Sequence, residues 1–186
     1  MSDLTDSLKN ALSSLVSGAG DVVSTTRDVT KENVIGLLEA GGDVASSSIG
    51  NLSSVVSEGV KAVSESGVSL EGGIVGLVEG VIEGVKKVGG NVGETALEAS
   101  KGTVRGANDV GSDVGAAAVS AVKGAIGAAG DIGEDSGSLA KEATIGAIQA
   151  ADEIGSDAGS LVRKALLNAA ALPHDVIDAV ISGKSE

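Results

Sequence analysis

Pairs of acidic residues four positions apart are the groups in this sequence best placed to do chemistry. Three such pairs are Asp109/Asp113, Asp131/Asp135 and Glu153/Asp157. On a helix the two members of a pair lie on one face, where their carboxylates could share a cation. Calcium and magnesium sites need more oxygen ligands, held in a shaped loop. We therefore interpret the pairs as a solvated helix face and expect no metal site.

Other residue types that carry out catalysis are absent or lack partners. The chain has no Cys, which excludes thiolate catalysis, disulfides and the usual structural zinc sites. His174 is the only histidine, and no His/Asp arrangement accompanies the many serines to make a nucleophile. Gly124, Gly127 and Gly130 suggest a phosphate loop, but no Gly-Lys-Ser/Thr follows them. The sequence predicts a protein that is not an enzyme and that uses no cofactor.

The charge of the chain limits its partners and its location. A net charge of −13 argues against nucleic acid, which proteins bind through clustered Lys and Arg. The N-terminus has acidic residues where a secretory signal would have basic ones. The least interrupted apolar stretch, Val114 to Gly130, is rich in Ala and Gly and contains Lys123, so we do not expect it to span a membrane. We expect a cytoplasmic protein, with a place at the periphery of a membrane or granule as the alternative.

The elements that position these residues follow an internal repeat. Short phrases, usually an acidic, an apolar and a small residue, recur every 22 residues without insertion or deletion. They begin at Asp21, Asp43, Glu65, Lys87, Asp109, Asp131, Glu153 and Asp175. Twenty-two is twice eleven, and eleven residues make three helical turns at 3.67 residues per turn. All charged residues except Arg27, Glu71 and Lys184 fall into five of the eleven positions, which form one polar arc beside a continuous apolar arc.

A helix explains this pattern better than the competing β-solenoid with a 22-residue rung. Successive residues of a strand point to opposite faces, so positions eleven apart would face opposite ways. In this sequence positions eleven apart share their polarity almost throughout. The pattern therefore predicts an all-α protein of long amphipathic helices with 22-residue repeats.

Glycine pairs at four-residue spacing predict how the helices pack. Such pairs let two helix backbones approach closely. We expect helix packing at Gly89, Gly93, Gly102, Gly106, Gly111, Gly115, Gly124, Gly133, Gly137, Gly146, Gly155 and Gly159. Between the two series of pairs stand bulkier residues that we expect to form an apolar lining, namely Val110, Val114, Ile132, Leu139, Ile154 and Leu161. The alternative is that glycine is merely tolerated in a low-complexity amphipathic helix.

The chain divides into three parts. Residues 1–20 are predicted to form an N-terminal amphipathic helix, 21–172 the repeat region, and 173–186 a short C-terminal helix and tail. Pro173 should end a helix at Leu172, and the last helix should run from His174 to Ile181, closed by Gly183. Candidate hinges are Gly18-Ala19-Gly20 and the pairs Gly41-Gly42, Gly72-Gly73 and Gly89-Gly90. The charge phase continues across the pairs, which favours hinges or no break over true loops.

The segments Val78 to Gly93 and Gly102 to Gly115 resemble the 11-residue amphipathic repeats of synucleins, perilipins and exchangeable apolipoproteins. The resemblance lies in the period and not in a diagnostic motif. It implies helices that lie on lipid surfaces, as bacterial phasins coat polymer granules. The chain lacks the lysine border and the interfacial aromatic residues of such repeats. In general character it is also similar to helical scaffold subunits of bacterial oxidoreductases, in which oligomeric helices form an apolar passage for quinone.

These observations lead to two functional hypotheses. The first is a structural protein that self-associates through its glycine and alanine margins into an oligomeric bundle, layer or tube. Its apolar face would contact a lipid, a quinone-like molecule, another helix layer or a partner protein complex. The second is a lipid- or granule-coating protein that becomes helical on binding. Protection against desiccation or ice is a third option without specific support.

Overall fold

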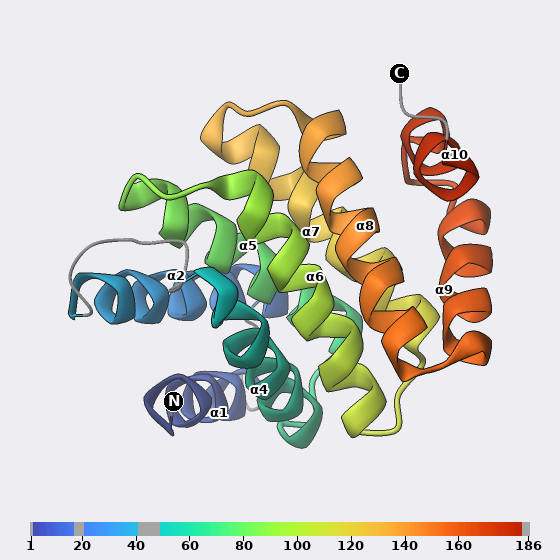
Figure 1. The fold of residues 1–186 in the computed structure, drawn as a ribbon. Coiled ribbons are helices and arrows are strands. Elements are labelled where there is room, and N and C mark those ends of the chain that lie inside the picture. Colours follow the sequence, from blue (N-terminus) through green and yellow to red (C-terminus); the bar gives the residue numbers. More distant parts are fainter. Residues whose placement is uncertain (1, 17–20, 41–48, 184–186) are drawn as a thin grey trace.

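The computed structural model describes residues 2–16, 21–40 and 49–183. This part of the chain contains helices and no strand, which confirms the predicted all-α class (Figure 1). The helices, labelled as in Figure 1, are α1 (Ser2–Val16), α2 (Val22–Ala40), α4 (Leu52–Glu65), α5 (Leu70–Lys87), α6 (Val92–Asp109), α7 (Val114–Ile132), α8 (Ser136–Ile154), α9 (Ser156–Asn168) and α10 (His174–Ser182).

A short turn with a fixed chemistry separates successive helices in the middle of the chain. Gly67, Gly89, Gly111 and Gly133 have positive φ values near 70°, a left-handed conformation that ends a helix at little cost only for glycine. Two residues after each glycine comes an N-cap residue, namely Ser69, Asn91, Asp113 and Asp135. The side chain of each N-cap accepts a hydrogen bond from a backbone N–H in the first turn of the next helix. Each glycine stops one helix and each N-cap starts the next.

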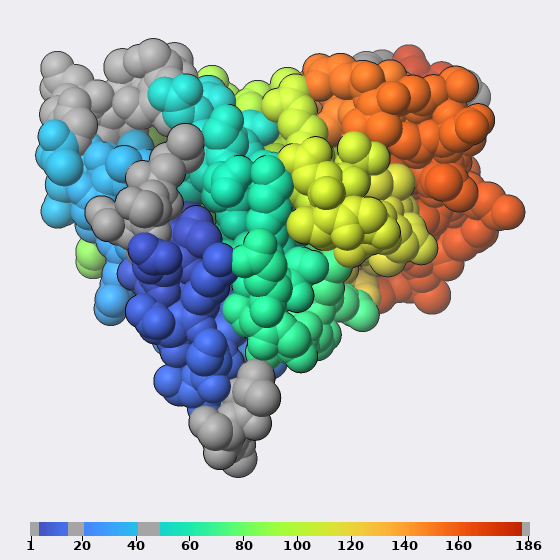
Figure 2. All heavy atoms as spheres, turned by 90° about the horizontal axis from the view of Figure 1, so that it is seen from below, coloured from blue at the N-terminus to red at the C-terminus, as the bar shows by residue number. Residues whose placement is uncertain are grey.

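The helices form two layers (Figure 1). Helices α2, α5, α7 and α9 lie side by side in one layer, and α1, α4, α6, α8 and α10 in the other. From α4 onward each helix also packs against the next helix along the chain, which belongs to the opposite layer, and α1 packs against α2 in the same way. Alternate helices therefore run in the same direction, and residues about two repeats apart meet within a layer. The N-terminal and C-terminal helices lie at opposite ends of the array (Figures 1 and 2).

The apolar faces of the two layers meet in one core. In its N-terminal half the core contains fully buried Leu52, Ile74, Leu77 and Ile82. In α7 and α8 it is built mainly of alanines, which are fully or almost fully buried. Small side chains fill a core at native density only if the helix backbones lie close together. The composition thus requires the close packing that the glycines permit.

The structure corrects the prediction of long helices with at most hinges. The helices are 9 to 19 residues long, and the chain reverses at Gly89-Gly90, whereas Gly72-Gly73 lies inside α5 without breaking it. The candidate hinges at Gly41-Gly42 and Gly18-Ala19-Gly20 lie outside the described residues. Near the C-terminus, α9 ends at Asn168, before the expected Leu172, and Pro173 is the N-cap of α10. Gly183, with a φ of 68°, follows that helix.

Candidate functional site: interhelical seams and the two ends of the array

Glycines line the contacts between neighbouring helices of one layer, which we call seams. In the α4–α6 seam, a Cβ on Gly106 would lie 2.9 Å from the carbonyl oxygen of Ser57, and one on Gly102 would overlap that of Ser53. In the α5–α7 seam, a Cβ on Gly124 would lie 2.8 Å from the carbonyl oxygen of Val75. These distances are too short for a real side chain against a backbone atom. The seam glycines allow direct backbone contact between parallel helices.

The same arrangement recurs in the α6–α8 and α2–α5 seams. A Cβ on Gly146 of α8 would overlap the carbonyl group of Leu97 on α6. On α5, a Cβ on Gly76 or Gly80 would overlap a carbonyl oxygen of α2, and one on Gly84 would lie 3.2 Å from the carbonyl oxygen of Lys31. Sequence reasoning left out the contact at Gly76, although the four-residue spacing to Gly80 was visible.

The other glycine series has a different role, and here the structure corrects the prediction. Gly89, Gly111 and Gly133 have positive φ and no atom within 4 Å of a Cβ position, and Gly155, with a φ of 156°, is equally open. They end helices and do not pack one helix on another within this chain. Their partners in the predicted pairs lie early in the next helices, at Gly93, Gly115, Gly137 and Gly159.

These four partner glycines have unequal surroundings. A Cβ on Gly115 would lie 2.9 Å from the Cβ of Ala165 on α9, and one on Gly159 would meet the Asp152–Arg163 ion pair. At Gly93 and Gly137 the nearest atoms lie 3.4 Å away or more, at ordinary contact distance. Only Gly115 of this set brings two helices of one layer closer than a side chain would allow.

Ion pairs cross the seams beside the glycines. Lys61 on α4 pairs with Asp109 on α6 at 3.1 Å, and Arg105 on α6 pairs with Glu153 on α8. The hydrogen bond to Arg105 lowers the pKa of Glu153. In the other layer, Lys86 on α5 pairs with Glu134 in the turn that follows α7. Each of these pairs joins residues 48 apart, two repeats plus one helical turn. The α4–α6, α6–α8 and α5–α7 seams therefore share one register, whereas the glycine contacts of the α2–α5 seam are shifted by about one helical turn.

The predicted acidic pairs divide their roles between turns and seams. Asp113 and Asp135 are N-caps. Asp109 and Glu153 form ion pairs across seams, with Lys61 and Arg105 respectively. Asp131 lies 3.7 Å from Arg27. Within residues 2–16, 21–40 and 49–183 no three His, Cys, Asp or Glu side chains are grouped so as to hold a metal ion.

Two buried carboxylates lie in the middle of the α2–α5–α7 layer. Glu79 and Glu83 on α5 are each only 8% exposed. Glu83 accepts a hydrogen bond from Lys31 on α2 at 2.8 Å and lies 3.9 Å from Arg27. Burial raises the pKa of Glu79 to about 7, although nearby Arg27 acts in the opposite direction. No feature of the sequence separates these glutamates from exposed ones.

The predicted lining residues do not form one continuous apolar surface. Leu139 is buried in the core, and Val110 and Ile132 are partly buried at helix ends. Val114, Ile154 and Leu161 come together in a groove of about 540 Å³ at the turns that join α6 to α7 and α8 to α9. Asp113 and Asp157 also line this groove, so it is not a closed apolar passage.

Apolar residues remain exposed at both ends of the array. At the N-terminal end, Leu37 on α2 is 48% exposed and lines a groove of about 450 Å³ between α1, α2 and α4. At the C-terminal end, Leu161 on α9 is 57% exposed and Leu167 is 37% exposed. Sequence reasoning did not identify Leu37 or Leu167, because the repeat pattern does not show which helices lie at the ends of the array.

Comparisons with known proteins add no family to this description. No protein-family model matches the chain, and no curated protein matches it significantly. None of the described helices combines the length and apolar character that crossing a bilayer requires.

Proposed function

We propose that this chain is a non-enzymatic scaffold protein that associates with copies of itself, and that the hydrophobic partner of its free apolar surface is another helix layer. One observation carries the proposal. Gly36 and Ala40 on α2 stand two repeats before the seam residues Gly80 and Gly84. A Cβ on Gly36, however, would meet no atom within 4 Å. Among the residues that the structure describes, α2 is thus the first helix of its layer and has the spacing of a seam with no neighbouring helix on it.

The distribution of charges also favours a structural role. Many charged side chains are engaged in ion pairs, several of them across seams. Exposed ion pairs contribute little stability individually, but a set that recurs from seam to seam favours one alignment of the helices. We regard the pairs as positioning groups of a repeating assembly.

The lipid-coat alternative has less support. It requires a wide apolar face that waits for a surface, whereas the apolar faces of the described helices are paired across the two layers. A lipid or quinone-like molecule would find exposed apolar atoms mainly at the ends of the array. The same ends are where a further helix would dock.

The test is the mass of the protein in solution, measured by multi-angle light scattering over a range of concentrations, with circular dichroism on the same samples. Refractive index must report the concentration because the chain has no Trp or Tyr. We expect a helical species of more than one chain. A single chain at every concentration would contradict the scaffold. A poorly helical chain that gains helix only with lipid vesicles would support the coat instead.

A further inference from the structure

The groove at the N-terminal end has an apolar floor and acidic sides. Leu4, Val34, Leu37 and Val55 supply the floor, and the carboxylates of Glu32 and Glu58 also line the groove. Glu58 already accepts a hydrogen bond from Lys61, whereas Glu32 forms no ion pair within the described residues. Gly36, also in the lining, leaves open space above α2. The groove therefore suits an apolar ridge that carries a positive charge.

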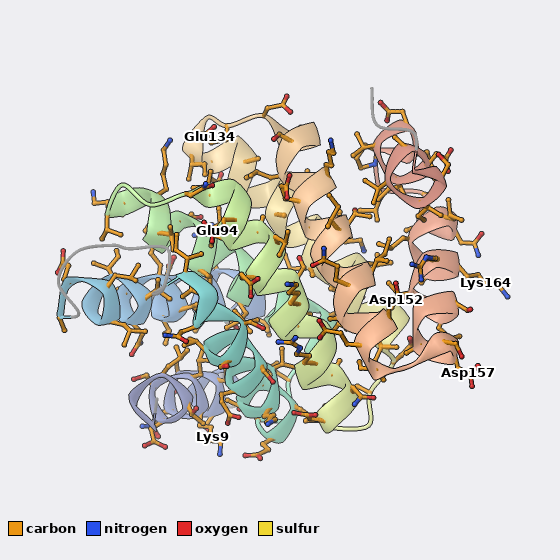
Figure 3. All side chains as sticks on the ribbon, viewed as in Figure 1. Lys9, Glu94, Glu134, Asp152, Asp157 and Lys164 are labelled. Carbon is orange, nitrogen blue, oxygen red and sulfur yellow. The ribbon has the colours of Figure 1, made fainter. Side chains whose placement is uncertain are left out.

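Helix α9, at the other end of the array, presents such a ridge. Leu161, Lys164 and Leu167 follow one another at three-residue spacing, so they form one inclined row on the helix surface. All three are exposed. Lys164 points away from the body of the molecule and forms no ion pair within the part of the chain that the structure describes (Figure 3). Its neighbour Arg163 is held by Asp152, at 2.6 and 2.7 Å.

We propose that the Leu161–Lys164–Leu167 ridge of one copy docks in the groove of a second copy, with the leucines on the apolar floor and Lys164 beside Glu32 and Glu58. This inference rests on the proposed function and names the interface by which the scaffold assembles. The docked helix lies over Gly36, where the absence of a side chain permits the close approach seen in the seams. The interface between copies thus repeats two features of the seams within the chain. One is a glycine where two helices cross, and the other is an ion pair beside it.

The positions of the two surfaces determine the kind of assembly. The groove lies among α1, α2 and α4, and the ridge on α9, at the opposite end of the array (Figure 1). An interface between two different surfaces is heterologous, and each copy that docks leaves its own free end for the next. The assembly is therefore a ring if the rotation closes and a filament if it does not.

Variants that block one end each test this directly. Gly36→Gln fills the groove with a flexible side chain and leaves the ridge intact. Leu161→Asp combined with Lys164→Glu makes the ridge acidic and leaves the groove intact. Gly130→Gln is the matched control, because Gly130 is also an exposed helical glycine with no atom within 4 Å, but lies on α7 away from both surfaces. Circular dichroism checks that each variant keeps the helicity of the parent.

Light scattering gives the result. We expect the parent and Gly130→Gln to form the same assembly, and each end-blocked variant to be a single chain at concentrations where the parent is assembled. An equimolar mixture of the two blocked variants should form a species of two chains, since one intact groove meets one intact ridge. Only a heterologous interface produces this rescue.

Other outcomes separate this interface from the scaffold itself. An assembled parent whose mass is unchanged by Gly36→Gln, or blocked variants that stay single when mixed, would overturn the docking but leave self-association standing. A parent that is a single chain at every concentration would overturn both proposals. Sedimentation of a single-chain parent with phosphatidylcholine vesicles, abolished by Gly36→Gln, would overturn the docking in favour of a lipid in the groove.

Discussion

The carboxylate of Glu79 on α5 occupies the space that a side chain on Gly127 of α7 would fill. Gly127 thus makes room for an acid that is only 8% exposed in the middle of a helical layer. The charge of Arg27 on α2 lowers the pKa of this acid, whereas the carboxylates of Asp131, Glu83 and Asp21 raise it. The stability of the fold should therefore depend on pH through Glu79.

Replacing Glu79 by Gln should stabilise the protein above neutral pH. The folded state raises the pKa of Glu79 from 4.5 to about 7 because burial disfavours its charged form. A raised acid pKa gives stability that is fully present below the unfolded value and is lost as the pH rises from 4.5 through 7. Glu79→Gln should remove that loss and raise the free energy of unfolding at pH 8 by at most about 3 kcal/mol. Urea unfolding followed by circular dichroism at pH 4.5 and pH 8 measures it, and equal effects at both pH values would contradict it.

The same substitution at Glu83 should have the opposite effect. Glu83 accepts a hydrogen bond from Lys31 at 2.8 Å and lies near Arg27, so its charge has partners. Glu83 is buried and Lys31 is partly exposed, so removing the charge of Glu83 weakens a charge-assisted hydrogen bond without freeing a fully buried lysine. We expect Glu83→Gln to lower the free energy of unfolding at pH 8 by about 1–3 kcal/mol. A variant as stable as the parent in the same urea titration would show that the pair contributes nothing.

A seam glycine and an exposed glycine should respond in opposite directions to alanine. A methyl group on Gly102 would overlap the carbonyl oxygen of Ser53, which belongs to the backbone and cannot move aside. Gly102→Ala should therefore lower the free energy of unfolding by about 1–3 kcal/mol. Gly130 has open space around it, so Gly130→Ala should raise stability by up to about 1 kcal/mol through helix propensity. Thermal unfolding of both variants measures the two changes in stability. Stabilisation by Gly102→Ala would mean that the backbones of α4 and α6 lie farther apart than the structure places them.

The all-α class was predictable because the charges keep an eleven-residue phase. The reversals were not predicted from that phase, because one helix and its turn together take 22 residues and so preserve it. The local signal was nevertheless present. Gly111 and Asp113 stand two residues apart, as a left-handed glycine and an N-cap require, and the same spacing recurs at Gly89 and Asn91. Helix-end chemistry should be examined before a continuous phase is read as a continuous helix.

The layer contacts were only partly predictable. Four-residue glycine spacing marks Gly102 and Gly106 as packing positions, and they do face a neighbouring backbone. It does not distinguish them from Gly111 and Gly115, because spacing contains no information on which glycine adopts positive φ. The burial of Glu79 was also beyond sequence reasoning. Its position in the eleven-residue pattern is polar, and only the neighbouring helices α2 and α7 remove it from water.

Gly111 provides the last prediction, which separates turn glycines from seam glycines. Its φ of 69° lies in the left-handed region, which costs a residue with a Cβ about 1–2 kcal/mol. No atom lies within 4 Å of a Cβ there, so the cost is conformational and not a clash. Gly111→Ala should lower the free energy of unfolding by about 1–2 kcal/mol, and Gly111→Asn by less, because asparagine tolerates left-handed φ. Urea unfolding of the two variants tests this ranking. An asparagine variant that is less stable than the alanine variant would mean that contacts, and not φ, determine the choice of glycine at this turn.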